Sequence, residues 1–357
     1  MSKADAVAAV LWISATMYAV FGGADFGAGL WSLVAGIGRR GRRARDLIDW
    51  AIGPVWEANH VWLIFALVVL WTGFSPAFEA VFSTLFVPLS LAALGIVLRG
   101  SGFAFHHTAR RTRGQALAAR VFGLASVLTP FFMGTVVGAV AGGRVPVGNA
   151  SGNHISSWLN PLSLVIGALF VSTGAYLSAV FLVSDARRAG APDLERYFGT
   201  RALGSALVTG ALAVVGLIAL HKDARYVFDR LVGDGLPLVI VSLVCGSVVL
   251  VLLHRGIQRG ARLLAAGAVT AVIWAWGVAQ YPYLLPQKLT LAGAAAPSAT
   301  LTSVLIVFGV AVVVVFPSLG LLYMLVQRNL VQETTSRPDP HLTDYDGVTA
   351  ARRPQPD

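Results

Sequence analysis

The sequence predicts an all-α fold, that of a polytopic membrane protein with about nine transmembrane helices. Of the 357 residues, 56% are hydrophobic and only 12% are charged, whereas an ordinary soluble domain carries roughly 25% charged residues. The mean hydropathy is +0.72. Apolar runs recur along the whole chain, and each is long enough to cross a hydrocarbon layer of about 30 Å. We therefore expect no continuous soluble domain.

The predicted spans follow one another with short connections, within a membrane domain that covers residues 1–330. We expect the first span to be a retained helix rather than a signal peptide, because it is long and lacks a small-residue cleavage site. Residues 331–357 are rich in Pro, Asp, Thr and Arg and are predicted to form a disordered cytoplasmic tail. The spans lie near residues 6–34, 54–73, 79–99, 121–141, 158–184, 202–220, 236–254, 263–282 and 301–327.

The distribution of positive charge predicts the orientation of these spans. The chain carries 27 Lys and Arg residues and a formal net charge of +10. Of the 27, 21 lie in the tail or in the loops after spans 1, 3, 5 and 7. The positive-inside rule places these loops in the cytoplasm and the N-terminus outside, which requires an odd number of spans and agrees with nine. The basic clusters are thus topology signals and lipid-headgroup contacts rather than nucleic-acid sites. The other six residues are Lys3, Arg144, Lys222, Arg225, Arg230 and Lys288.

The sequence offers none of the usual motifs of soluble enzymes. Cys245 is the single cysteine, so it cannot form an intrachain disulfide. CxxC and HExxH spacings and a Walker loop are missing from the sequence. Among the seven histidines only His60 lies clearly within a span, and it has no second ligand at the same depth with which to hold a haem. We expect this chain to bind no metal or haem itself, and His60 to serve as a hydrogen-bonding residue.

The first span contains Asp25, within the segment FGGADFGAG at residues 21–29. An ionisable residue inside a membrane helix is costly and is usually retained for a function or a partner. The surrounding glycines form a surface of small residues that lets helices approach closely, and we expect them to serve packing alone. Packing does not explain the aspartate, which we place in the cytoplasmic half of the span.

The second span begins with the segment GPVWEANHVWLI, which contains three polar side chains in an otherwise apolar helix. Glu57 lies one turn into the helix, and His60 is about 60° from it, on the same face. Trp56 and Asn59 flank His60 on the adjoining face.

Asp25 and Glu57 are expected at a similar depth on consecutive antiparallel helices. The cluster around Glu57 is compatible with the start of a proton path, an ion site, or polar contacts with a partner subunit. A carboxylate at a helix N-terminus can also act only as a cap.

The third span ends in the segment LRGSGFAFHH. Its Arg99 is predicted either to anchor the helix by snorkelling to the cytoplasmic interface, or to pair with an acid such as Glu57 or Asp25. The eighth span ends in the segment WAWGVAQYPYLLP. Its aromatic residues are typical of the aromatic belt that membrane proteins place at the membrane interface.

The segments GGADFGAG, GPVWEANHVWLI, LRGSGFAF and AQYPYLLP, with the following LTLAGAAAPSATL, are similar to subunit II of the cytochrome bd-type quinol oxidases. The resemblance runs from about residue 6 to 330, and the WEANHVWLI block is its most specific part. It implies a haem-free subunit of a terminal oxidase that oxidises membrane quinol and reduces O2 to water in a bacterial cytoplasmic membrane.

The resemblance also implies an architecture and partners. It predicts a four-helix bundle at residues 6–141, a second at residues 158–282 and a peripheral helix at residues 301–327. The partner is a subunit I that carries haems b and d. A small accessory subunit, membrane lipids and a structurally bound quinone or lipid are compatible with the resemblance.

In the family an acid at the position of Glu57 begins a proton path from the cytoplasm toward subunit I, and Trp62 matches a tryptophan near a proposed gas route. Better-known members have Asp, Gly and Gln where this chain has Glu57, Ala58 and His60, which changes the reach of the acid. We expect Glu57, Asp25 and His60 to form the proton path, with Arg99 as a charge partner and Trp56, Asn59 and Trp62 near the interface.

Two other classes of protein remain as alternatives. A secondary transporter would use Asp25 and Glu57 as a coupling-ion site, but it would need paired broken helices in two repeats. The C-terminal half contains no second acidic span flanked by glycines, which argues against this class. A purely structural subunit would keep the embedded acids only to fix helix packing.

Overall fold

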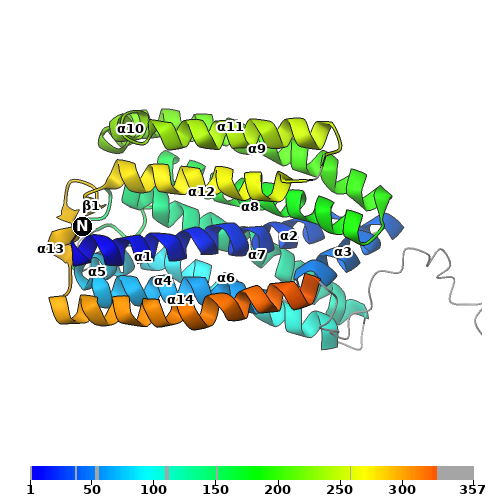
Figure 1. The fold of residues 1–357 in the computed structure, drawn as a ribbon, viewed down its shortest axis with the longest axis horizontal. Coiled ribbons are helices and arrows are strands. Elements are labelled where there is room, and N and C mark those ends of the chain that lie inside the picture. The colour runs from blue at the N-terminus through cyan, green and yellow to red at the C-terminus, as the bar shows by residue number, and fades with distance from the viewer. Residues whose placement is uncertain are drawn as a thin grey trace, which may run out of the picture.

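A computed structural model describes residues 2–36, 38–52, 56–108, 112–149, 152–257 and 259–327. Almost all of this part of the chain is helical, and the long helices run side by side along the longest axis of the molecule (Figure 1). The first span consists of α1 (Lys3–Met17), a π-helical turn η1 (Tyr18–Gly22) and α2 (Gly23–Val34). The other elements are α3 (Arg39–Ile52), α4 (Trp56–Gly73), α5 (Ser75–Thr84), α6 (Phe86–Thr108), α7 (Thr112–Ala141), α8 (Pro161–Arg188), α9 (Pro192–Asp223), α10 (Arg225–Val232), α11 (Leu236–His254), α12 (Ala261–Gln280), β1 (Tyr283–Leu285), β2 (Leu289–Thr290), α13 (Leu291–Ala294) and α14 (Ser298–Gln327).

Seven helical segments in the described residues are long and apolar enough to cross a membrane, and a bent pair of helices raises the number to as many as eight. The protein is therefore a multi-pass membrane protein. In α6 the apolar helical stretch within the described residues is Phe86–Gly102. The count of nine spans stays a prediction. The predicted tail, residues 331–357, lies outside the described residues.

The bent pair corrects the predicted start of the third span. The apolar parts of α4 and α5 meet at an angle of 116°, and Phe74 between them has a non-helical backbone and a fully buried side chain. Pro76 lies in the first turn of α5, where its missing N–H costs no hydrogen bond. The predicted third span, which began at residue 79, thus starts inside α5, and the long helix α6 begins only at Phe86.

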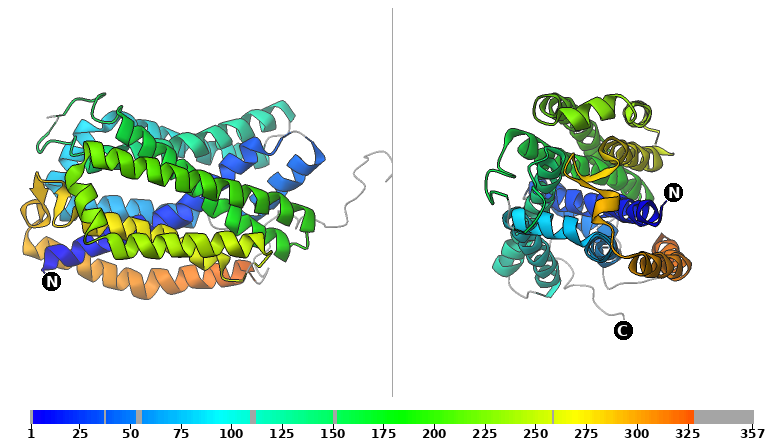
Figure 2. Two further views of the ribbon diagram at one scale, coloured as in Figure 1. Left: turned by 90° about the horizontal axis from the view of Figure 1, so that it is seen from above. Right: turned by 90° about the vertical axis from the view of Figure 1, so that its left-hand side faces the viewer.

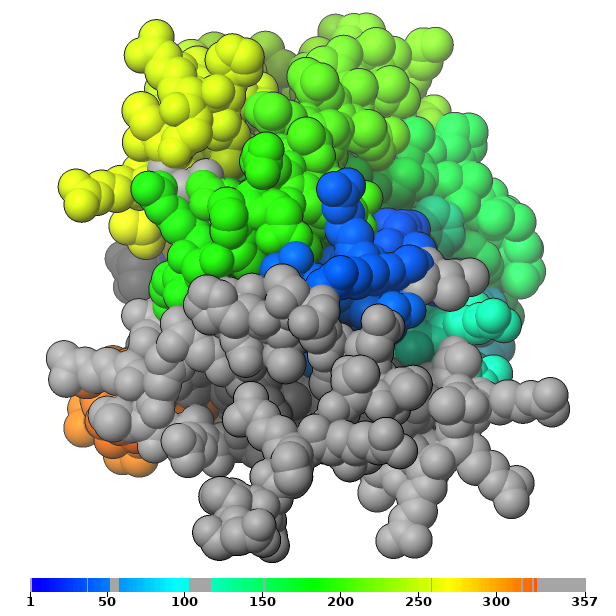
Figure 3. Space-filling model, turned by 90° about the vertical axis from the view of Figure 1, so that its right-hand side faces the viewer, coloured from blue at the N-terminus to red at the C-terminus, as the bar shows by residue number. Residues whose placement is uncertain are grey.

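Two connections contain amphipathic helices that the apolar runs did not predict. Helix α3 buries Ala44, Leu47 and Ile48 against the end of α8 and the start of α9, and Figure 3 shows its blue residues beside the green ones at this end of the molecule. Helix α10 joins α9 to α11 at the opposite end. Both fit the pattern of short helices that lie in the membrane interface.

Close backbone contacts hold the N-terminal span against the interior helices. A Cβ atom added at Gly27 in α2 would lie 1.9 Å from the carbonyl oxygen of Gly174 in α8. One added at Gly29 would lie 2.1 Å from Oγ of Ser126 in α7. These contacts confirm that the glycines around Asp25 serve helix packing. Helix α14 lies outside this core, alongside α1 and α4 (Figure 2).

Candidate functional site

Asp25 and Asn59 form the centre of a buried polar cluster between the first span and α4. Asp25 is 6% exposed in the first turn of α2, directly after the π-helical turn. Asn59 is 2% exposed in α4, and its side-chain Nδ2 donates a hydrogen bond to the carboxylate of Asp25. The hydrogen bond supplies the compensation that a buried carboxylate requires. The same hydrogen bond shows that Asp25 of the first span lies at the level of Asn59, within the WEANHVWLI segment of the second span.

Arg99 lies on the other side of Asp25 and is 1% exposed in α6. Its Nε donates a hydrogen bond to Oγ of Ser126 at 3.3 Å. Its guanidinium carbon lies 4.9 Å from the centre of the Phe26 ring and 5.1 Å from that of Phe122. The guanidinium and the Asp25 carboxylate attract each other electrostatically.

The burial of Arg99 excludes one of the two predictions for this residue. Snorkelling to the interface is wrong, because the side chain is enclosed by α2, α6 and α7. The alternative, a charge partner for an acid, stays a prediction, which the electrostatic attraction between Arg99 and Asp25 supports. A guanidinium that lies over two aromatic rings is stabilised by cation–π interactions.

Aromatic rings lie around His60, and one of them, Phe26, also contacts Arg99. The imidazole centre lies 6.0 Å from the ring of Tyr18 and 6.2 Å from that of Phe26, both in edge-to-face geometry. Tyr18, Phe26 and Trp62 belong to one buried hydrophobic cluster. The predicted residues Asp25, Asn59, His60, Trp62 and Arg99 therefore lie in one region of the molecule.

The π-helical turn brings Tyr18 among these rings. A π-turn inserts an extra residue into a helix and often occurs at functional sites. The ring of Tyr18 covers Gly22, where an added Cβ would lie 2.8 Å from the ring. Among the described residues, the hydroxyl of Tyr18 and Nη2 of Arg99 are buried without a hydrogen-bond partner. Both groups interact electrostatically with the buried carboxylate of Asp25.

The backbone of α4 begins at Trp56, but the side chains of Trp56 and Glu57 lie outside the described residues. Their predicted roles stay predictions. Sequence reasoning missed Tyr18, Phe26 and Ser126. The described part of the chain contains no group of three His, Cys, Asp or Glu side chains that could hold a metal ion.

Comparison of the whole chain with known proteins gives a family match. The family model for cytochrome bd terminal oxidase subunit II matches residues 4–326. The chain is similar to a protein of Bacillus subtilis (strain 168) that is provisionally named a cytochrome bd menaquinol oxidase subunit II. The two are 23% identical over 332 residues, which are 90% of this chain and 94% of the relative.

Two further similarities agree with this match. The chain is 28% identical over 220 residues to cytochrome bd-I ubiquinol oxidase subunit 2 of Escherichia coli (strain K12), which is 59% of this chain and 55% of that protein. Its fold resembles a chain in the structure of the bd oxidase from Geobacillus thermodenitrificans, with a TM-score of 0.73 and 27% sequence identity. That similarity covers 92% of this chain and 100% of the other.

Proposed function

The chain belongs to the cytochrome bd terminal oxidase subunit II family, and from this premise we propose that it is the haem-free subunit of an oxidase that oxidises membrane quinol and reduces O2 to water. The observation that carries the proposal is the family match over residues 4–326. The names of the relatives, a menaquinol oxidase and a ubiquinol oxidase subunit, support a quinol as the reductant. In this proposal haems b and d belong to a partner subunit I.

We further propose that the chain stabilises the partner and conducts protons to it from the cytoplasm. The outward surface of α4 supports this role, because it carries an exposed apolar series at Val61, Ile64, Val68 and Trp71. At 3.6 residues per turn, Glu57 is in register with that series. This apolar surface is suited to contact with a second subunit. Because Glu57 lies on the same side of α4, the arrangement favours proton transfer from Glu57 into the partner. Asn59, in contrast, faces the interior and contacts Asp25.

Asp25 and His60 would complete this path on the side of the interior. A carboxylate that is buried, hydrogen-bonded and close to a positive charge can accept and release a proton without contact with lipid. The polar groups of Tyr18 and Arg99 provide sites for bridging water next to it. In the proposed order, Glu57 takes up a proton from the cytoplasm and Asp25 and His60 assist its transfer toward subunit I.

Purification of the affinity-tagged chain from its native membranes tests the overall function. We expect a second, haem-containing polypeptide to co-purify, a visible spectrum with haem bands, and O2 uptake that depends on added quinol. A colourless chain without a partner, which instead supports substrate flux in vesicles, would contradict the oxidase and favour a transporter.

The Glu57→Gln variant tests the proton path in the assembled oxidase. We expect normal haem content and a turnover that falls most steeply at alkaline pH, where protons are scarce and an uptake group matters most. Glu79→Gln is the matched control, because Glu79 is an exposed acid in α5 at the other end of the bundle. Unchanged turnover of an intact Glu57→Gln oxidase at alkaline pH would refute the relay, and loss of haem would favour a structural role.

A further inference from the structure

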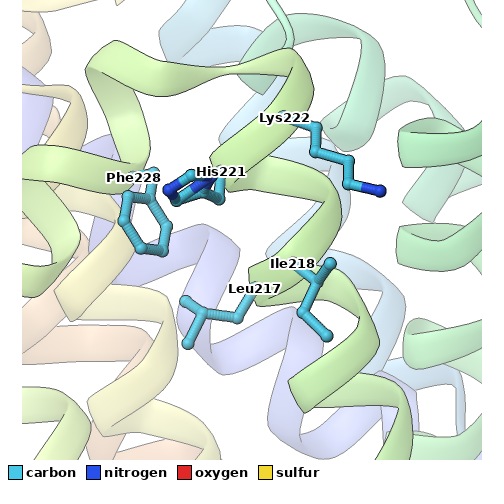
Figure 4. A pocket seen from close by; sticks show the side chains of 5 residues that line it. All are labelled: Leu217, Ile218, His221, Lys222 and Phe228. Atoms are coloured by element: carbon cyan, nitrogen blue, oxygen red, sulfur yellow. The ribbon is translucent and has the colours of Figure 1, made fainter.

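A shallow pocket of about 330 Å³ lies where α9 ends and α10 begins. It is at the end of the molecule opposite α3, away from the basic loops. Leu217, Ile218 and Phe228 form its apolar walls, and His221 and Lys222 lie at its rim (Figure 4). In Figure 4, His221 lies one turn above Leu217 and faces Phe228, while Lys222 extends above Ile218.

The apolar part of the pocket continues onto the membrane surface of α9. Leu207, Val208, Val214, Val215 and Ile218 are exposed on this helix, which is long and apolar enough to cross a membrane. Exposed aliphatic side chains on a membrane-crossing helix contact acyl chains. The wall formed by Leu217 and Ile218 is therefore the last part of a lipid-facing surface before the helix reaches the interface.

Side chains of α10 contact the polar residues at the rim of the pocket. The imidazole of His221 lies 4.7 Å from the Phe228 ring, in edge-to-face geometry. Nη1 of Arg225 donates to Nε2 of His221 at 2.6 Å, while Nε of Arg225 lies 3.0 Å from the Asp229 carboxylate. His221 and Arg225 are thus fixed and already paired.

Lys222 differs from its neighbours in having no partner. Within the described residues its ammonium group makes no ion pair and no hydrogen bond. It lies at the boundary between the apolar surface of α9 and water, which is the depth at which the phosphates of a lipid leaflet lie. An unpaired ammonium at this depth is complementary to a phosphate.

We propose that this pocket binds a membrane phospholipid, with the headgroup phosphate on Lys222 and the first part of an acyl chain along Leu217 and Ile218. The side chain of Phe228 would cover the glycerol region. Helix α10 lies flat at the membrane interface in this arrangement, and a bound lipid would join it to α9. The inference does not depend on the proposed oxidase function, because it needs only that α9 crosses the membrane.

Photocrosslinking on the protein in its native membranes tests the proposal. One probe is a phospholipid with a diazirine near the carboxyl end of its acyl chain, and the second is the matching diacylglycerol, which lacks the phosphate. We expect the phospholipid probe to label residues 217–228, and the Lys222→Gln variant to be labelled about fivefold less at the same probe concentration. The Arg144→Gln variant is the control, because Arg144 is an exposed cation in the loop after α7, outside the pocket.

Three results would overturn the proposal. Equal labelling of residues 217–228 by the two probes would show that the phosphate is not recognised and that the contact is that of any surrounding lipid. Complete lack of labelling by both probes would show that another polypeptide covers the pocket. Equal loss of labelling in the Lys222→Gln and Arg144→Gln variants would also contradict it, because it would indicate a general effect of charge at this surface.

Discussion

At the scale of single residues, the contact between Asn59 and Asp25 is one of two interactions that compensate a carboxylate inside the membrane domain. Two kinds of group offset the cost of its burial, an amide donor on α4 and a guanidinium on α6. Arg99 is itself enclosed and donates a hydrogen bond to Ser126, so both charges lie away from the surface of the chain. The three side chains therefore act as one unit.

Replacement of Asn59 by Leu should destabilise the protein. The volume is nearly kept, but the buried Asp25 carboxylate loses a hydrogen-bond donor, which costs about 1–3 kcal/mol. We expect a lower midpoint of thermal unfolding for the purified oxidase. The Thr72→Val variant is the control on the same helix, since Thr72 is exposed and its hydroxyl bonds only to the carbonyl of Val68. An Asn59→Leu protein that unfolds at the wild-type temperature would show that the amide contributes nothing.

Part of the polar cluster could be predicted from the sequence, because charges stand out in apolar runs. Asp25 and Arg99 were identified in this way. Tyr18 and Ser126 were not, since tyrosine and serine are common in membrane helices and carry no such signal. The π-helical turn that directs Tyr18 toward His60 is a feature of the backbone, and the sequence does not mark it.

At the scale of elements, the packing of α2 on α8 depends on the absence of a side chain at two facing positions. The Gly27→Ala variant would place a methyl group 1.9 Å from the carbonyl oxygen of Gly174, so the helices must separate. Overpacking of this kind costs about 1–3 kcal/mol. We expect a lower yield of assembled oxidase and a lower unfolding midpoint.

The Gly210→Ala variant on α9 is the matched control for this substitution. No atom lies within 4 Å of the added methyl group there, and alanine favours a helix by about 1 kcal/mol over glycine. We expect Gly210→Ala to be neutral or slightly stabilising. Equal stability of the Gly27→Ala and Gly210→Ala proteins would contradict the close contact of α2 with α8.

Two ion pairs between helices should differ in strength because they differ in burial. Nη2 of Arg262 lies 2.5 Å from the carboxylate of Asp185, whose side chain is only 9% exposed and also contacts Arg188. Nη1 of Arg43 lies 2.6 Å from the carboxylate of Asp193, but these side chains are 38% and 33% exposed. Burial makes the loss of one partner more costly, because the remaining charge is poorly hydrated.

We expect Arg262→Gln to lower the free energy of unfolding by about 2 kcal/mol, less than for a fully buried pair because Arg262 is itself partly exposed. Arg43→Gln should cost about 0.5 kcal/mol or less, since water screens that pair. Double-mutant cycles with Asp185→Asn and Asp193→Asn measure both coupling energies. A coupling for the Arg43 pair that equals or exceeds that of the Arg262 pair would show that burial does not govern their strength.

Apolar run length was sufficient to place most membrane helices but not the elements between them. The predicted spans at residues 158–184 and 236–254 agree closely with α8 and α11. Helices α3 and α10 were missed because half of each surface is polar, so their mean hydropathy is low. In α3 the spacing of Ala44, Leu47 and Ile48 would have indicated an amphipathic helix.

At the scale of the whole molecule, the two ends of the bundle differ in charge and in structure. One end carries the basic helix α3 and the connection between α8 and α9, and the other carries α10, the β1–β2 hairpin and α13 (Figure 1). The basic end coincides with the loops that hold most of the 27 Lys and Arg residues. The charge asymmetry thus follows the long axis along which the helices would cross a membrane.

This asymmetry predicts which end faces the cytoplasm, and cysteine labelling in intact cells measures it. In a Cys245→Ala background, which contains no cysteine, we expect Val147→Cys to react with a membrane-impermeant maleimide added outside. Arg40→Cys, in the basic helix α3, should react only after the membrane is permeabilised, because positive loops are retained in the cytoplasm. Both positions are exposed in the protein, so a difference in labelling reports the side of the membrane. The reverse pattern would place Glu57 at the outer surface and would exclude proton uptake from the cytoplasm through it, since the start of α4 lies toward the same end as α3.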